Sequence, residues 1–333
     1  MDERSPVDPF LRGVRMRHRV VLNVAGLPMA FESNQRWPLD LARDAYNRLP
    51  ALRKLPVATL RCLVTDDDAD EALPPGTLTF GDARTESALI SRANTATLNL
   101  AAHSALITLN AAAEHAPLRI RVDLIEFAGY RLAQHALRAI GVHAACVAQN
   151  GAGVLIMGDS GAGKSTLVAA CLAGGWDVIA EDSTFLLPRG NRARGVPAFI
   201  HLMQDALVLF PEAGFERSVH CEIVRKSGKR KVEIDVRRYR NQQALPVETR
   251  LRGVIILTGS ESAERAELPA LQRVRQREAA AVLQRYQPYA LAQPGWQKAI
   301  SELCSLPIAA FVSGRNLSAS VEALARFLKN HHD

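Results

Sequence analysis

Hydrophobic and polar residues alternate along several short segments in the first third of the chain. Residues 19–24 and 27–31 show this alternation on either side of Ala25-Gly26, which predicts a β-hairpin. Further strands are predicted at 56–64, 88–91, 95–100 and 105–109. This part of the chain is therefore expected to be mostly β.

Helical spacing of apolar residues appears at 39–49 and again at 123–140. A chain of 333 residues predicts about two domains. We expect a disordered N-terminus over 1–17, a mostly β region with a connecting helix over 18–140, and a second domain over 141–330.

The pattern changes after residue 141 to short, continuous apolar runs, which are typical of buried strands in an α/β sheet. Residues 142–148 and 153–157 are two such runs, and Asn150-Gly151 between them is a strong hairpin signal. If these two residues form the turn, Val147 pairs with Val154 and His143 pairs with Gly158. A longer turn would shift that register.

Strands and helices alternate over the rest of the chain. Helices are expected at 164–172, 277–286, 296–304 and 318–329, and strands at 176–180, 184–188, 251–258 and 307–312. The apolar run at 196–210 does not distinguish a strand from a helix. Alternation on both sides of Ser227-Gly228 predicts a hairpin with basic residues at its tip, either solvated or binding acidic groups.

A glycine-rich segment lies between the strand at 153–157 and the helix that follows. It fits the pattern G-x-x-x-x-G-K-[S/T], a phosphate-binding loop. Glycines allow backbone N–H groups to turn toward phosphate oxygens, while the lysine reaches the terminal phosphates and the serine binds Mg²⁺. The alternative is a glycine-rich turn with an incidental lysine. The residues are Gly158, Asp159, Ser160, Gly161, Ala162, Gly163, Lys164, Ser165 and Thr166.

Two carboxylates, Glu181 and Asp182, follow the next predicted strand. Ligands of open α/β sheets bind beyond the carboxyl ends of the strands. Acids in that position suit Mg²⁺ binding and the acceptance of a proton from an attacking hydroxyl. The alternative is a solvated loop. The hairpin register would bring His143 to the same place, unless it is an edge-strand histidine without a role.

These residues together resemble the catalytic core of the HPr kinase/phosphorylase family. That family has H-G-V before the loop, G-D-S-G-x-G-K-S as the loop and A-D-D after the following strand, and the match runs without gaps from His143 to Asp182. The resemblance implies an α/β P-loop kinase core, similar to the C-terminal domain of HPr kinase, that uses ATP and Mg²⁺. It also implies that Glu181 deprotonates a serine hydroxyl, while Asp182 lies with His143 and shares the metal with Ser165.

The chain departs from the family at three points. Glu181 replaces an aspartate, so Asp182 is an alternative base; Thr166 replaces a glutamate; and the second family signature, I-R-G-x-G-I-I-D-V, is not visible. The chain therefore resembles the broad group of HPr-kinase-like serine and peptide kinases more than the HPr enzyme. The predicted function is transfer of the γ-phosphoryl group of ATP to a serine-type hydroxyl of a protein or peptide. The alternatives are a small-molecule kinase of the same fold and a nucleotide-binding regulator with little catalysis.

Composition adds a few limits. The cysteines are scattered without C-x-x-C spacing, which predicts a reducing, cytoplasmic environment and no zinc site. No apolar run is long enough for a membrane span. A net charge of +7 favours acidic partners but no specific nucleic acid. The acidic segment 65–71 is expected to be a surface loop. The sequence leaves open the acceptor, ATP against GTP, the reverse reaction and a homo-oligomer.

Overall fold

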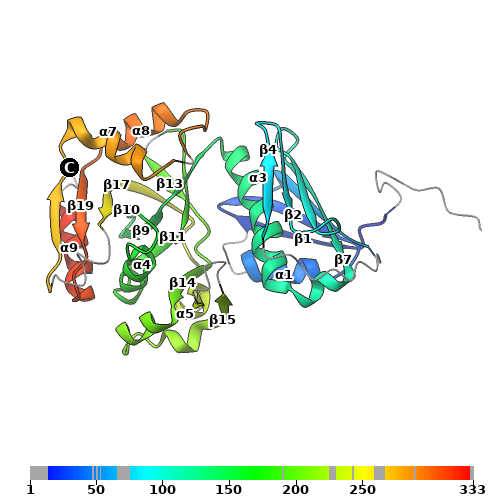
Figure 1. Ribbon diagram of the computed structural model, residues 1–333, viewed down its shortest axis with the longest axis horizontal. Coiled ribbons are helices and arrows are strands. Elements are labelled where there is room, and N and C mark those ends of the chain that lie inside the picture. Colours follow the sequence, from blue (N-terminus) through cyan, green and yellow to red (C-terminus); the bar gives the residue numbers. More distant parts are fainter. Residues whose placement is uncertain are drawn as a thin grey trace, which may run out of the picture. The chain divides into compact units, whose positions relative to one another are not determined.

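The computed structural model describes residues 14–46, 49, 52, 54–65, 76–189, 191–224, 230–241, 244–258, 267–288 and 290–330. The chain divides into two compact units, the first ending at Ala136 and the second continuing from Leu137 (Figure 1). Most of the predicted N-terminal segment, the acidic loop from residue 66 and the tip of the basic hairpin at 225–229 lie outside the described residues.

The first unit contains a seven-stranded sheet in the order β1-β2-β3-β7-β6-β5-β4. The predicted hairpin is confirmed, since Val24 pairs with Leu27 across Ala25 and Gly26, both at positive φ (50° and 82°). Strand β3 is parallel to both of its neighbours, and the other pairs are antiparallel. The strands are β1 (His18–Val24), β2 (Leu27–Ser33), β3 (Ala58–Thr65), β4 (Leu78–Gly81), β5 (Thr85–Leu89), β6 (Thr95–Asn99) and β7 (Ser104–Asn110).

Helical segments complete this unit and lead out of it. They are α1 (Trp37–Tyr46), η1 (Ala111–His115), α2 (Pro117–Ile120), the π-helical η2 (Arg121–Glu126) and α3 (Phe127–Leu137). The helix predicted at 123–140 therefore ends early. Arg138 has a φ of 50°, a left-handed conformation that ends helices, and Ile140 already belongs to the next strand.

The second unit is built on a nine-stranded sheet. Seven strands follow the order β11-β9-β10-β17-β13-β12-β8, and β19 pairs with both β17 and β18. The strands are β8 (Ile140–His143), β9 (Ala145–Gln149), β10 (Ala152–Gly158), β11 (Asp177–Ala180), β12 (Ser183–Leu186), β13 (Arg192–Arg194), β17 (Glu248–Leu257), β18 (Ala270–Arg273) and β19 (Ile308–Val312).

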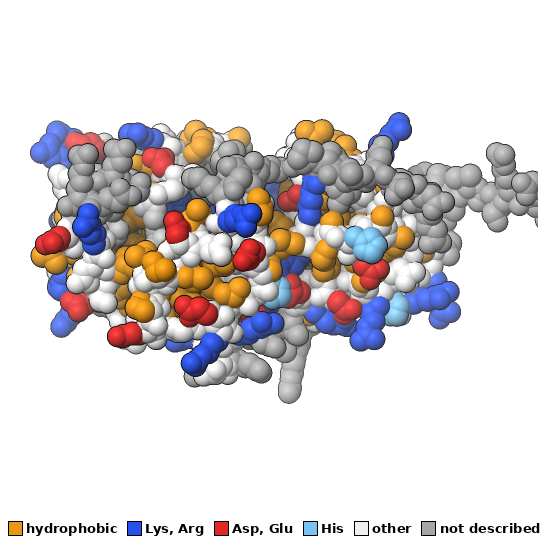
Figure 2. All heavy atoms as spheres, turned by 60° about the horizontal axis from the view of Figure 1, so that its bottom comes forward, with side chains coloured by type: hydrophobic (Ala, Val, Ile, Leu, Met, Phe, Trp, Pro, Cys, Tyr) orange, Lys and Arg blue, Asp and Glu red, His pale blue; other side chains and the backbone are white. Residues whose placement is uncertain are grey.

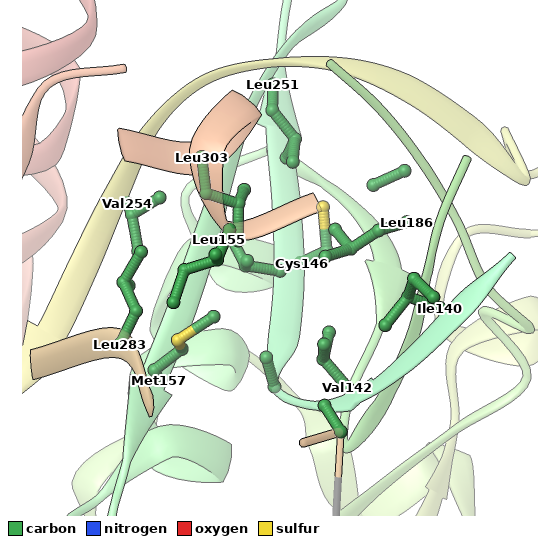
Figure 3. Close-up of a cluster of buried hydrophobic side chains, with 14 of the residues drawn as sticks. Ile140, Val142, Cys146, Leu155, Met157, Leu186, Leu251, Val254, Leu283 and Leu303 are labelled. Atoms are coloured by element: carbon green, nitrogen blue, oxygen red, sulfur yellow. The ribbon is translucent and has the colours of Figure 1, made fainter. Parts of the chain in front are cut away.

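Helices cover both faces of this sheet. Helices α7 (Gln276–Arg285) and α8 (Trp296–Cys304) pack on one face, where Figure 3 shows Leu283 and Leu303 meeting Leu155 and Met157 of β10. Helix α4 (Lys164–Ala173) packs against β9, β10 and β11 and contacts α9 (Leu317–Lys329). Because β10 is covered on both sides, all of its residues are buried, which explains its continuous apolar sequence.

A separate three-stranded antiparallel sheet lies beside α4 and has the order β14-β16-β15. Its strands are β14 (Phe199–Met203), β15 (Val219–Val224) and β16 (Arg230–Asp235). The short helices η3 (Gln204–Leu209), η4 (Phe215–Ser218) and α5 (Val236–Tyr239) adjoin it. The ambiguous run at 196–210 thus contains a strand followed by a 3₁₀ helix.

The strand predicted at 142–148 is broken at Ala144, whose N–H donates to the carbonyl of Val142 (3.0 Å). Strand β9 keeps the predicted register with β10, and the pairing of Val147 with Val154 is confirmed. Strand β8 instead pairs with β12, so the predicted pairing of His143 with Gly158 is wrong and His143 lies opposite Ser183. The break moves the histidine to a different part of the sheet.

The surface carries mixed charge. On the face shown in Figure 2, basic and acidic side chains lie interspersed, so the net charge of +7 does not gather there as one basic patch. Within the described part of the chain, no helix combines the length and the apolar character that crossing a membrane requires.

Gly195 permits a close approach between the segment after β13 and strand β11. A Cβ at this position would lie 2.6 Å from the Cβ of Ala180 and closer still to the carbonyl oxygen of Ile179. We predict that Gly195→Ala lowers the free energy of unfolding by about 1–3 kcal/mol through overpacking. Urea denaturation measures this. Gly76→Ala is the matched control, since a Cβ there meets nothing within 4 Å; an equal loss in both variants would contradict the prediction.

Candidate functional site

Two loops meet at one edge of the nine-stranded sheet. Strand β9 is antiparallel to both β10 and β11, so β10 and β11 run in the same direction on either side of it. Their carboxyl ends, Gly158 and Ala180, therefore lie at the same edge. The glycine-rich loop follows the first strand, and Glu181 and Asp182 follow the second. The topology thus brings together two segments that the sequence singled out separately.

The glycine-rich loop turns directly into helix α4. Gly161 and Gly163 have φ values of 86° and 95°, which residues with a Cβ rarely adopt. Gly163 is the N-cap of the helix and offers no side-chain hydrogen bond to it. The first N–H groups of a helix have no acceptor within the helix, and their partial positive charge attracts anions. The loop therefore has the backbone geometry of an anion-binding site.

Lys164, the first residue of α4, is folded against this loop. Its Nζ donates to the carbonyl oxygens of Gly158 (2.8 Å) and Asp159 (3.2 Å), and the residue is 7% exposed. Burial lowers the pKa of Lys164, and the negative charges of Asp182 and Glu181 oppose this effect only in part. The ammonium group is thus held at the loop.

Ser165 and Glu181 form a hydrogen-bonded pair in which Glu181 is buried and Ser165 is half-buried. The Ser165 hydroxyl donates to Oε1 of Glu181, while the other carboxylate oxygen lies 3.2 Å from Nδ1 of His201. Burial alone would raise the pKa of Glu181, but the hydrogen bonds from His201 and Ser165 hold it below its usual value. Glu181 is therefore ionised, and both of its oxygens are occupied. The sequence had grouped Ser165 with Asp182 as metal ligands.

Asp182, in contrast, is accessible. Its Oδ1 lies 3.2 Å from Nδ1 of His143, and the two side chains are 59% and 42% exposed. This contact follows from the pairing of β8 with β12, which sets His143 opposite Ser183, the residue after Asp182. His143 thus reaches the site through the pairing of β8 with β12, and not through the predicted pairing with Gly158.

Two glutamines fix the strand that carries His143. Gln287 accepts a hydrogen bond from the His143 N–H and donates one to its carbonyl, both at 2.9 Å. Gln293 makes the same pair of bonds to Gly141, at 2.9 and 2.8 Å. Both glutamines lie between α7 and α8, and together they replace the hydrogen bonds of a neighbouring strand along the outer edge of β8.

His201 is the functional candidate that sequence reasoning missed. It bridges two buried carboxylates, with Nδ1 3.2 Å from Glu181 and Nε2 3.0 Å from Glu233. Burial would lower the pKa of His201, but its hydrogen bonds to both carboxylates, with their negative charges, raise it to about 9. The only local signal was a histidine within an apolar run, because the bridge depends on the pairing of β14 with β16.

The site residues named by the sequence therefore fall into two groups around one loop. Lys164 and Glu181 are buried and Ser165 is half-buried, whereas His143 and Asp182 face solvent. The remaining loop residues form the turn, and Thr166 lies in the first turn of α4. Hydroxyl and carboxylate oxygens beside a lysine and free N–H groups fit a hard cation such as Mg²⁺ together with an anion.

No family model matches the chain, and neither does any curated protein. Among solved structures, the chain is similar to the Hpr(Ser) kinase/phosphatase from Coxiella burnetii, with 17% identity and a TM-score of 0.31, over 57% of this chain and 96% of that chain.

We predict that His201 stays protonated in neutral solution. With a pKa near 9, against 6.5 for an ordinary histidine, its ring should keep the NMR shifts of imidazolium at pH 7.5 and titrate near pH 9. Since the folded-state pKa is raised, its contribution to stability is complete below about pH 6.5 and is lost as the pH rises through 9. A neutral His201 ring at pH 7.5 would contradict this assignment.

Proposed function

We propose that this chain is an ATP-dependent, Mg²⁺-requiring phosphotransferase that moves the γ-phosphoryl group to a serine-type hydroxyl of a protein or peptide. One observation carries the proposal: an accessible His143–Asp182 pair lies at the same sheet edge as a glycine-rich loop with a buried lysine and a serine–carboxylate pair. This arrangement offers an anion site, a cation site and a proton acceptor together. The sequence resemblance to HPr-kinase-like enzymes supports the same reading.

The loop and its lysine would bind the phosphates of ATP. Free N–H groups at the start of α4 would contact phosphate oxygens, and Lys164 would exchange its bonds to loop carbonyls for bonds to the terminal phosphates. Ser165 and Glu181 would hold Mg²⁺, because they already form a pair of oxygen donors beside the loop. Bound Mg²⁺ supplies neutralisation of the charge on the transferring phosphoryl group.

The remaining carboxylate would accept the proton of the attacking hydroxyl. Glu181 is less suited to this, since Ser165 and His201 occupy its oxygens and its pKa is lowered. Asp182 is exposed, and the imidazole of His143 lies 3.2 Å from its Oδ1 and would orient it. We therefore assign the base to Asp182, the alternative that the sequence left open, and a ligand role to Glu181. With ATP as donor, we also propose a cytoplasmic location.

Transfer of label from [γ-³²P]ATP tests the whole proposal. Host extract is incubated with Mg²⁺ and wild-type protein, Lys164→Ala or Lys298→Ala, the last replacing an exposed lysine of α8 as a control. Wild type and Lys298→Ala should label a macromolecular acceptor on serine, and Lys164→Ala should lose at least about 100-fold, because one preorganised electrostatic contact is worth that much.

The other outcomes separate the alternatives. Label that depends on Lys164 but appears in a small metabolite would replace the protein acceptor with a small-molecule one. Nucleotide binding by the wild-type protein with no Lys164-dependent label in any fraction of the extract would favour a nucleotide-binding regulator. Equal labelling by Lys164→Ala and wild type would remove the loop from the mechanism.

A second pair of variants separates the two acids. Asp182→Asn should lower turnover by a factor of about 10²–10⁴, as loss of a general base does. The Mg²⁺ concentration needed for half-maximal rate should change little. Glu181→Gln should raise the Mg²⁺ concentration needed for half-maximal rate, because a charged ligand becomes neutral. Initial rates across a Mg²⁺ titration measure both effects, and the reverse pattern would exchange the two roles.

A further inference from the structure

The three-stranded sheet sets three chemically active side chains in a row. Glu233 on the central strand β16 pairs with His201 of β14 on one side and with Cys221 of β15 on the other. Residues directly opposite one another on antiparallel strands share a face of the sheet. Cys221 Sγ accordingly lies 3.5 Å from Oε2 of Glu233, and His201 holds the other carboxylate oxygen, Oε1, at 3.0 Å.

A β-bulge adds a fourth group to this row. The register between β15 and β16 shifts between Val219 and Cys221, so His220 is the extra residue. In a regular strand, His220 and Cys221 would point to opposite faces, whereas a bulge re-aims one side chain. As a result, a ring nitrogen of His220, Sγ of Cys221 and a carboxylate oxygen of Glu233 all lie within 4.8 Å of one another.

We propose that His220, Cys221 and Glu233 form a binding site for a thiophilic divalent transition metal, with Zn²⁺ the best match. Sulfur, imidazole nitrogen and carboxylate oxygen are the three ligand types of protein zinc sites. With ordinary zinc–ligand lengths, two ligands of a tetrahedral ion lie roughly 3.6 Å apart. The sulfur and the carboxylate oxygen already stand at 3.5 Å. On metal binding, the Cys221 thiol releases its proton to solvent and binds as thiolate.

Support for the ligands is built into the same sheet. Glu233 is 1% exposed, and its bond to His201 leaves Oε2 directed toward Cys221. Metal-binding side chains in proteins are held in this way by outer hydrogen bonds. The ring of His220 packs at 5.3 Å on that of Phe199, which limits its rotation. Water would complete the four-coordinate sphere, because three protein ligands leave one position open.

This site is separate from the proposed Mg²⁺ position and rests on no part of the proposed function. Cys221 differs from the other cysteines of the described chain by facing both a histidine and a carboxylate. The sequence had predicted no zinc site because it lacks C-x-x-C spacing. That criterion does not detect two adjacent ligands that meet a third across a bulged ladder.

Cobalt substitution tests the site on the full chain. Metal-free protein is titrated with Co²⁺ and then with Zn²⁺, in wild type, Cys221→Ser and Cys304→Ser, the last changing another partly buried cysteine as a control. Wild type and Cys304→Ser should bind one Co²⁺ and show thiolate-to-cobalt charge-transfer absorption that one equivalent of Zn²⁺ abolishes. In Cys221→Ser the absorption should disappear and affinity should fall at least 10-fold, since even outer-shell changes cost about 10–100-fold.

Absence of the thiolate band in wild type, or its persistence in Cys221→Ser, would overturn the proposal. A second measurement needs no variant. Zn²⁺ should protect Cys221 of the wild-type protein from iodoacetamide, with Cys304 as the internal reference, as mass spectrometry of the digested chain can show. Equal alkylation of Cys221 with and without Zn²⁺ would also overturn it.

Discussion

Two buried carboxylates share one imidazolium, and a series of hydrogen bonds runs from that bridge to the start of the helix after the glycine-rich loop. Glu181 and Glu233 are 8% and 1% exposed, and burial of two negative charges is costly unless a cation lies between them. His201 provides it, with one ring nitrogen for each carboxylate. Removing the imidazole would leave two like charges facing each other with no cation between them.

The bridge also joins two sheets that the chain forms separately. Glu181 follows a strand of the nine-stranded sheet, whereas His201 and Glu233 belong to the three-stranded one. From Glu181 the contacts continue to Ser165 at the start of α4, which itself packs against β14. A continuous set of charged hydrogen bonds therefore runs from the three-stranded sheet to the glycine-rich loop. The three-stranded sheet thus helps to hold Glu181 in place at the candidate site.

Local features of this site could be predicted, and remote ones could not. The conformation of the glycine-rich loop is set by residues within the loop itself. The pairing of Val147 with Val154 is likewise set by the turn between their two strands. The apolar run around Ala144 contains no local signal of a break. The break depends instead on the strand that β8 pairs with, β12, which lies some 40 residues further along the chain. His201 was missed for the same reason: its role requires a pairing between strands that no short pattern specifies.

The two glutamines along β8 also affect how this edge strand can interact with other protein chains. Strand β8 is the last strand of its sheet, and an uncovered last strand invites pairing with another chain. Gln287 and Gln293 occupy the backbone groups of His143 and Gly141 that such a chain would use. The same two side chains that orient a candidate catalytic histidine therefore also block the outer backbone groups of β8 from pairing with a second chain.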